Sequence, residues 1–232
     1  MSAPEPVAVS WSGGKDSALA LHAIRADPSL RVEALVTTIT DGYDRISMHG
    51  VRRSLLDVQV AALGVSLVEA RIPIDASNAS YEAAMTSALS GLQARGISRV
   101  VFGDLFLADV REYRERLLAG VGMRGLYPLW LRDTRELAEQ FIESGFRAIL
   151  ACVDPRQVPA ALCGREFDHA LLSDLPKDAD PCGERGEFHT FVYDGPIFET
   201  PIAVERGEVV KRGGFWFQDL GATEGGNSGG RG

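Results

Sequence analysis

Most of the residues able to do chemistry lie in two short segments of the sequence. The first is close to the N-terminus and combines hydroxyls, glycines and adjacent opposite charges: Ser12, Gly13, Gly14, Lys15, Asp16 and Ser17. Glycine lets a ligand approach the main chain, and the first turn of a helix offers unpaired N–H groups and a positive dipole end. Lys15 adds a full positive charge, and the serines add hydroxyl donors. The segment predicts a binding site for a phosphate chain.

This loop differs from the common GxxxxGK[ST] phosphate loop, because Lys15 is followed by Asp16. A carboxylate beside a bound phosphate would repel it unless a cation lies between them. We therefore expect Asp16 to help hold Mg²⁺. Two alternatives stay open: Asp16 caps the helix, or the whole segment is a glycine turn with a helix cap.

The second segment lies near the C-terminus and combines carboxylates with an imidazole on a glycine-containing turn: Cys182, Gly183, Glu184, Arg185, Gly186, Glu187, Phe188 and His189. On an extended chain Glu187 and His189 face the same side, because they are two residues apart. Such groups can bind an ammonium group, orient an amine or accept its proton. The alternative is an acidic turn that leads into a partly exposed strand.

Alternating strands and helices are expected to position the first segment. Apolar and β-branched runs predict strands at 7–10, 32–39, 66–72 and 100–102, and apolar spacing predicts helices at 18–26, 51–62 and 81–92. In the second helix the stripe is Val51, Leu55, Val58 and Ala62. The alternation predicts a parallel α/β sheet whose ligand lies beyond the carboxyl ends of the strands. Residues 12–17, 40–49 and 103–109 occupy those ends and should line one crevice.

The pattern changes near residue 125. Asp133 and Glu136 form a capping box that opens a helix to about residue 144, and residues 146–153 read as a strand. Beyond residue 155 the sequence breaks into short pieces rich in Gly, Pro and Asp. We predict a first domain over 1–125, a smaller α/β domain over 126–220, and a disordered tail over 221–232.

Composition limits the classes of function. The apolar content of 45% with 24% charged residues is typical of a globular protein, and the net charge of -8 opposes strong general binding to nucleic acid. The basic strip over 111–116 is interleaved with glutamates, which favours a solvated helix face. No apolar run is long enough to span a membrane and no signal peptide is evident, so we expect a cytoplasmic protein without a membrane partner. Three scattered cysteines indicate neither a disulfide framework nor a zinc site.

The phosphate loop after an N-terminal strand resembles the PP-loop of the N-type ATP pyrophosphatases, which split ATP between its α and β phosphates. The second segment narrows the resemblance to the diphthine–ammonia ligase family, also called the diphthamide synthase domain family. Gly103-Asp104, Pro128-Leu129-Trp130 and residues 164–168 match it as well. Residues 188–195, together with residues 47–50 and 106–109, resemble the corresponding segments of the prokaryotic branch of this family.

This resemblance implies a Rossmann-like (HUP-type) fold, with ATP and Mg²⁺ as cofactors. It also implies a carboxylate substrate that is adenylated and then amidated by ammonia: diphthine on an elongation factor in archaea and eukaryotes, and an acceptor left open in bacteria. The expected ATP-binding residues are Ser12, Gly13, Gly14, Lys15, Asp16, Ser17, His49, Gly103 and Asp104, with Asp16 and Asp104 on the metal. The expected catalytic residues are Lys15, Asp16, Glu184, Glu187 and His189. A homodimer stays open.

Two other functions compete with an amide ligase. A PP-loop sulfurtransferase that modifies tRNA usually needs paired reactive cysteines and a basic face, and this sequence has unpaired cysteines and a negative charge. A nucleotide sensor without catalysis would not need the polar segment around Glu184. No glutaminase cysteine is evident either, so free ammonia is the simplest nitrogen donor.

Overall fold

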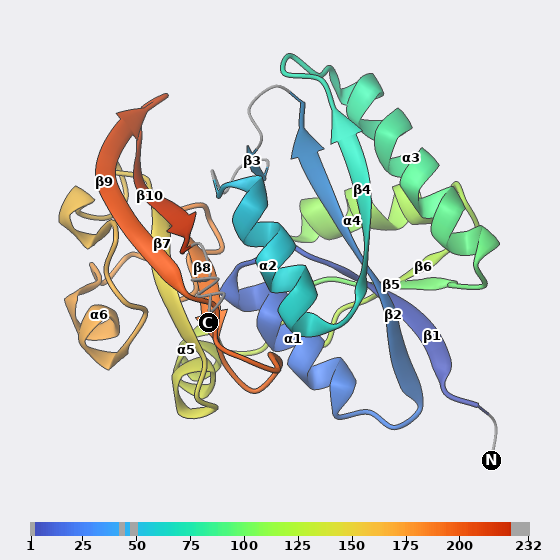
Figure 1. Ribbon diagram of the computed structural model, residues 1–232, viewed down its shortest axis with the longest axis horizontal. Coiled ribbons are helices and arrows are strands. Elements are labelled where there is room, and N and C mark those ends of the chain that lie inside the picture. Colours follow the sequence, from blue (N-terminus) through green and yellow to red (C-terminus); the bar gives the residue numbers. More distant parts are fainter. Residues whose placement is uncertain (1–2, 42–44, 47–50, 224–232) are drawn as a thin grey trace, which may run out of the picture.

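The structure, a computed structural model, describes residues 3–41, 45–46 and 51–223. Its first layer is a parallel sheet in the order β4-β2-β1-β5-β6, and the short β3 pairs in antiparallel with the end of β2 (Figure 1). The strands are β1 (Glu5–Ser10), β2 (Leu30–Thr40), β3 (Arg45–Ile46), β4 (Ser66–Ile72), β5 (Arg99–Val101) and β6 (Arg124–Leu126). The parallel sheet predicted from the strand–helix alternation is confirmed.

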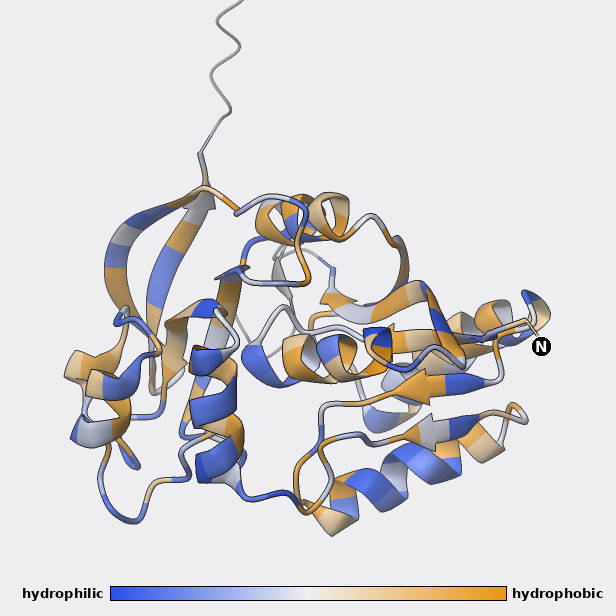
Figure 2. Cartoon of the chain, turned by 90° about the horizontal axis from the view of Figure 1, so that it is seen from below, coloured by the Kyte–Doolittle hydropathy of each residue, from blue (hydrophilic) through white to orange (hydrophobic). Residues whose placement is uncertain are grey.

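Helices cover both faces of this sheet (Figure 1). They are α1 (Lys15–Arg25), α2 (Arg53–Leu63), α3 (Asn78–Ala94) and α4 (Ala108–Ala119). Successive side chains of a strand point to opposite faces, so Val7 and Val9 join the core on the α1 side while Ala8 joins the core under α3. Figure 2 shows apolar and polar bands on the helices, as expected where one helix face packs on a sheet.

The buried face of α2 differs from the predicted stripe. Val58 is 36% exposed, and the buried residues are Leu55, Leu56, Gln59 and Leu63. The helix is therefore rotated so that a polar residue, Gln59, occupies the buried face. Its amide group is fully hydrogen-bonded there, which offsets the cost of burying it.

A second, antiparallel sheet follows in the order β8-β7-β10-β9. Its region comprises α5 (Thr134–Glu143), β7 (Arg147–Val153), a short turn of 3₁₀ helix (Ala160–Leu162), α6 (His169–Asp174), β8 (Phe188–Asp194), β9 (Val204–Arg212) and β10 (Phe215–Ala222). The Asp133 carboxylate accepts from the Glu136 amide at 3.0 Å, which confirms the predicted cap. Gly221 and Ala222, placed in the predicted tail, pair with β9, and residues 224–232 lie outside the described residues.

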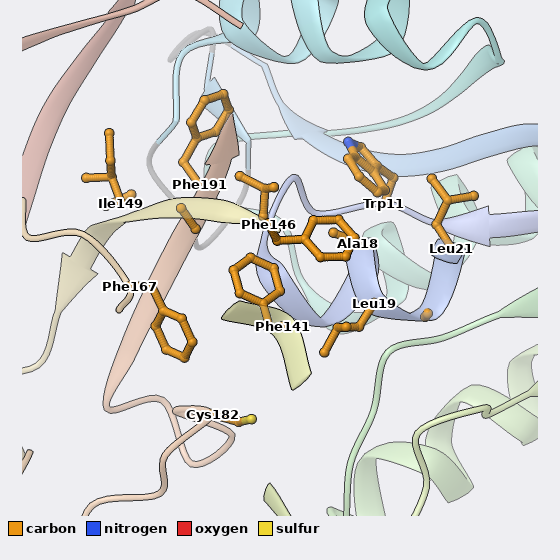
Figure 3. Close-up of a cluster of buried hydrophobic side chains, with 14 of the residues drawn as sticks. Trp11, Ala18, Leu19, Leu21, Phe141, Phe146, Ile149, Phe167, Cys182 and Phe191 are labelled. Carbon is orange, nitrogen blue, oxygen red and sulfur yellow. The ribbon is translucent and has the colours of Figure 1, made fainter. Parts of the chain in front are cut away.

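The two sheets share one hydrophobic core around α1. Trp11 and Ala18, from the first sheet region, belong to the same buried cluster as Phe146, Phe167 and Phe191 from the second (Figure 3). The cluster places β8 directly against the start of α1. The phosphate loop therefore lies at the junction of the two sheets.

Gly103 lies where the chain leaving β5 touches the first turn of α1. A Cβ atom at this position would stand 2.6 Å from the Asp16 carbonyl carbon and 3.0 Å from the Ser17 nitrogen. We expect Gly103→Ala to lower the free energy of unfolding by about 1–3 kcal/mol, because backbone must move to admit the methyl group. Urea denaturation measures this change.

A matched control is Gly91→Ala on α3, where a Cβ would meet nothing within 4 Å. There we expect no loss, or a gain of about 0.5–1 kcal/mol from the better helix former. Equal stability of both variants would show that the contact at Gly103 is not tight.

Candidate active site at the junction of the two sheets

The phosphate loop connects β1 to α1 through a tight turn. Gly13 has φ 77°, a conformation that other residues rarely adopt. Ser12 Oγ and Ser17 Oγ are 3.2 Å apart, and Ser17 Oγ donates to the Gly14 carbonyl at 2.8 Å. In the described part of the chain the Ser17 amide has no recorded acceptor. The head of α1 therefore presents the Ser12 hydroxyl and the free Ser17 amide, which are donors expected of an anion site.

Lys15 is the cation of this loop, and only 2% of it is exposed. Its Nζ donates to both carboxylate oxygens of Asp16, at 2.7 and 2.8 Å, and lies 5.9 and 5.8 Å from the ring centroids of Phe167 and Phe188. Burial alone would lower the pKa of Lys15, but the charge and hydrogen bonds of Asp16, together with the nearby Cys182 and Glu184, outweigh it, and the net shift is upward. Lys15 is therefore charged, and the adjacent aromatic faces also favour a cation.

Asp16 and Asp104 face the same space from two different elements. Burial raises the pKa of both carboxyl groups above the ordinary value, with a further contribution from Asp180 at Asp16 and from Asp16 at Asp104. Asp104 Oδ2 is 2.8 Å from Arg114 Nε, yet both atoms are buried without hydrogen-bond geometry. Two such carboxylates fit Mg²⁺, which proteins hold through one or two carboxylates together with substrate phosphates.

The acidic segment reaches this space through Glu184 and His189. Glu184 Oε1 accepts from the Leu105 amide at 2.8 Å, and burial raises the pKa of Glu184 to about 7. Burial lowers the pKa of His189 to about 4, with a further contribution from the charge of Lys15. The imidazole is therefore neutral at neutral pH, while Glu184 lies near its titration midpoint.

These groups line one cavity of about 250 Å³. It is lined by residues predicted for the site from three distant segments: Ser12, Gly14, Lys15, Asp16, Ser17, Gly103, Asp104, Glu184 and His189. Gly13 does not line it but shapes the turn behind it. His49 lies outside the described residues. The structure thus brings the phosphate loop and the acidic segment together, although Glu184 follows Ser17 by 167 positions in sequence.

Glu187 is not among the residues that line the cavity. Its carboxylate is buried in its own loop, where Oε1 accepts from the Asp180 amide and Oε2 from the Arg185 amide, both at 2.9 Å. Glu187 precedes β8, so the same-side rule for an extended chain does not apply to Glu187 and His189. The geometry gives Glu187 a structural role, here called the holding role: its carboxylate stabilises the turn that carries Glu184.

We expect Glu187→Gln to lower the free energy of unfolding by about 1–3 kcal/mol, because the amide group can replace only one of the two acceptor oxygens. Thermal and urea unfolding measure this loss. Glu208→Gln, on the exposed part of β9, is the matched control and should leave stability unchanged. A Glu187→Gln protein as stable as the control would contradict the holding role.

A second cavity of about 510 Å³ adjoins the first and shares Ser12 and Arg114 with it. Thr37 and Thr38, on β2, and Tyr81, on α3, line this space. Its volume lies within the range of small-ligand pockets, and its mixed polar and apolar lining suits a nucleoside beside the phosphate loop.

Sequence reasoning missed three residues of this junction: Arg114, Gln59 and Thr190. Arg114 lies in the strip predicted to be a solvated face, but its guanidinium is 4.6 Å from the centroid of the Phe102 ring. The burial of Gln59 could have been predicted from the sequence, because this polar residue follows the apolar Leu55 by four positions and so lies on the same face of the helix. For Thr190 no sequence signal existed beyond its place next to His189.

The fold and the site define a Rossmann-like PP-loop protein with a second sheet packed on its phosphate loop. Comparison with known families gives the particular one. The diphthamide synthase N-terminal domain matches residues 5–125, and the diphthamide synthase C-terminal domain matches residues 133–225. The chain belongs to the diphthamide synthase family; its place in the prokaryotic branch stays a prediction.

Curated relatives include proteins named diphthine–ammonia ligase. That of Schizosaccharomyces pombe is 31% identical over 119 residues, which are 50% of this chain and 20% of the relative. Those of Bos taurus and Homo sapiens are 32% and 31% identical over 110 residues, 45% of this chain and 41% of each relative. The chain thus spans less than half the length of these relatives.

Proposed function

We propose that the protein is an ATP-dependent ligase that adenylates a carboxylate and converts it to an amide with ammonia. The observation that carries this proposal is the single cavity that joins the phosphate loop, Lys15, Glu184 and His189. A phosphate-binding half and a proton-accepting half in one space suit a reaction that first activates an acid with ATP and then brings in an amine.

In the first step a carboxylate oxygen of the substrate attacks the α phosphorus of ATP. The bond from that phosphorus to the bridging oxygen breaks, and pyrophosphate leaves. Lys15, the Ser17 amide and the Ser12 hydroxyl would stabilise the charge on the leaving pyrophosphate. Mg²⁺ held by Asp16 and Asp104 would neutralise charge on the phosphate oxygens when it is bound.

In the second step the nitrogen of ammonia attacks the acyl carbon, and the bond to AMP breaks. One proton must leave the nitrogen for a neutral amide to form. Glu184 is the residue whose pKa suits this transfer, since burial raises it to about 7. The neutral imidazole of His189 would accept or donate a hydrogen bond that orients the amine.

The name of these relatives gives the acceptor and the nitrogen donor for this proposal: diphthine and ammonia. By analogy with these relatives, we propose that the acceptor of this protein is a substrate that bears a carboxylate.

The cysteines favour this reaction over sulfur transfer. Burial raises the pKa of Cys182 and Cys152 to about 12 and that of Cys163 to about 11. Thiols with such values are not nucleophilic thiolates at neutral pH.

In the described part of the chain no helix is long and apolar enough to cross a bilayer.

The proposal is tested by following ATP labelled at the α or γ phosphate with purified protein, Mg²⁺, ammonium and a diphthine-bearing elongation factor. We expect AMP and pyrophosphate in equal amounts, together with an amidated acceptor detected by mass spectrometry. Formation of ADP and phosphate instead, or the absence of any ATP binding, would overturn the proposal.

The rate of amide formation should depend on pH through Glu184. The carboxylate accepts a proton only when ionised, so the rate ratio of wild type to Glu184→Gln should rise with pH and level off above about 7. Taking this ratio removes the change in free ammonia, which affects both proteins equally. A ratio that is flat with pH would exclude Glu184 as the proton acceptor.

The same pKa has an opposite effect on stability. Between the ordinary value of 4.5 and about 7, the folded protein holds the Glu184 proton more tightly than the unfolded chain. The contribution of this group to stability is therefore present below pH 4.5 and is lost as the pH rises through this window. A fall in activity at low pH would not come from unfolding caused by Glu184.

A further inference from the structure

Strand β8 of the second sheet contacts the phosphate loop through two hydrogen bonds to the backbone of the loop, one made by a side chain and one by the backbone of β8. The Lys15 amide donates to Thr190 Oγ1 at 3.0 Å, and the Val192 amide donates to the Gly13 carbonyl at 2.9 Å. These bonds join residues 175 and more positions apart, which belong to different sheets. Part of the loop's shape is therefore set by the C-terminal region.

Gln59 ties the same elements together from the other side. Its Nε2 donates to the Gly13 carbonyl at 3.1 Å and to the Val192 carbonyl at 2.7 Å, while Trp11 Nε1 donates to Gln59 Oε1 at 3.1 Å. There is little free space at this contact: a Cβ on Gly14 would stand 3.2 Å from the Thr190 carbonyl oxygen. The loop and β8 are therefore joined by several buried hydrogen bonds and a close backbone contact.

Thr190 changes which donors the loop offers to a phosphate. Its hydroxyl oxygen accepts a hydrogen bond from the Lys15 amide, which is one of the first-turn donors that would otherwise face an anion. The hydroxyl still has a proton to donate, and no acceptor for it is recorded in the described part of the chain. Thr190 is 3% exposed and lines the cavity that Lys15 and Ser17 line.

We propose that Thr190 is a binding residue for the pyrophosphate portion of ATP, and that Gln59 is the positioning residue that holds β8 against the loop. The Thr190 hydroxyl accepts from the Lys15 amide and donates to a phosphate oxygen. The C-terminal region thus completes the phosphate site in addition to supplying Glu184 and His189. This inference rests on the proposed function only in requiring that a phosphate chain occupies the cavity.

Calorimetric titration of Thr190→Val with pyrophosphate, ATP and AMP, each with Mg²⁺, tests this inference. Valine keeps the shape of threonine and removes the hydroxyl. We expect about tenfold or greater weakening for pyrophosphate and ATP, since a hydrogen bond to a charged group is lost. AMP, which lacks the β and γ phosphates, should bind within about twofold of wild type, whereas a general distortion of the site would weaken all three ligands.

Three further variants complete the test. Thr190→Ser keeps the hydroxyl and should restore pyrophosphate affinity, and Gln59→Leu should weaken it without touching Thr190. Thr86→Val removes an exposed hydroxyl on α3 and should change nothing. Should Thr190→Val not fold, Thr190→Cys replaces it, because a thiol is a weak donor of similar size.

The outcomes separate the two proposals. A wild-type protein that binds neither ATP nor pyrophosphate would defeat the proposed function. A wild-type protein that binds both, with Thr190→Val or Thr190→Cys binding pyrophosphate equally well, would overturn the role of Thr190 alone.

Discussion

Replacement of Lys15 by methionine is expected to lower the rate of pyrophosphate release about a hundredfold to a thousandfold. Lys15 is the buried cation at the head of α1, and methionine keeps most of its length, one atom less, while removing its charge. Preorganised charge in a site closed to water has its largest effect on groups that gain negative charge during the reaction. Single-turnover assays with labelled ATP measure the adenylation step directly.

The variant should still fold, because the partner of Lys15 can adapt. Burial already raises the pKa of Asp16, so without Lys15 this carboxyl group can take up a proton rather than remain an unpaired buried charge. Circular dichroism and thermal unfolding check this. Lys177→Met, at an exposed lysine, is the matched control and should retain full activity. Pyrophosphate release at the wild-type rate in folded Lys15→Met would remove Lys15 from the site.

Replacement of Glu184 by glutamine is expected to slow amide formation about a hundredfold or more while adenylation continues. A positioned general base typically contributes a factor of this size. Glutamine still has an oxygen that can accept from the Leu105 amide, so the loop should keep its shape. The adenylate is measured by pyrophosphate exchange into ATP, and the amide by mass spectrometry of the acceptor.

Glu187→Gln is the informative comparison for this experiment. Both changes convert a carboxylate to an amide within the same segment, but only Glu184 lines the cavity. Loss of amide formation in Glu184→Gln with normal unfolding, and loss of stability in Glu187→Gln, would separate a reacting group from a holding one. Loss of both steps in Glu184→Gln would instead mean that Glu184 supports ATP binding.

Several features follow from the sequence alone because they depend on neighbours along the chain. The period of apolar residues predicts strands β1, β2, β4 and β5 and helices α1, α2 and α3, although not the three-residue strand β6, and the Asp133 cap predicts the start of α5. The glycine turn at Gly13 and the lysine at the head of α1 follow from local backbone rules. These rules also place Ser12–Ser17 and Gly103-Asp104 at one edge of a parallel sheet, where the structure has them.

Other features were decided only by tertiary structure. A spacing rule put Glu187 beside His189, but the Asp180 and Arg185 amides draw its carboxylate into the loop. The rotation of α2 depends on partners that Gln59 finds 46 and 133 residues away.

The sequence by itself therefore predicted a phosphate site at the head of the first helix, and it indicated what kind of chemistry the C-terminal carboxylates and imidazole could do. The tertiary structure decided which of those carboxylates reaches the site, and that β8 completes the loop through Thr190. The physical reason is that a buried polar side chain turns toward whichever donors and acceptors the packed chain places near it. Those partners are set by contacts between sheets, which no local pattern records.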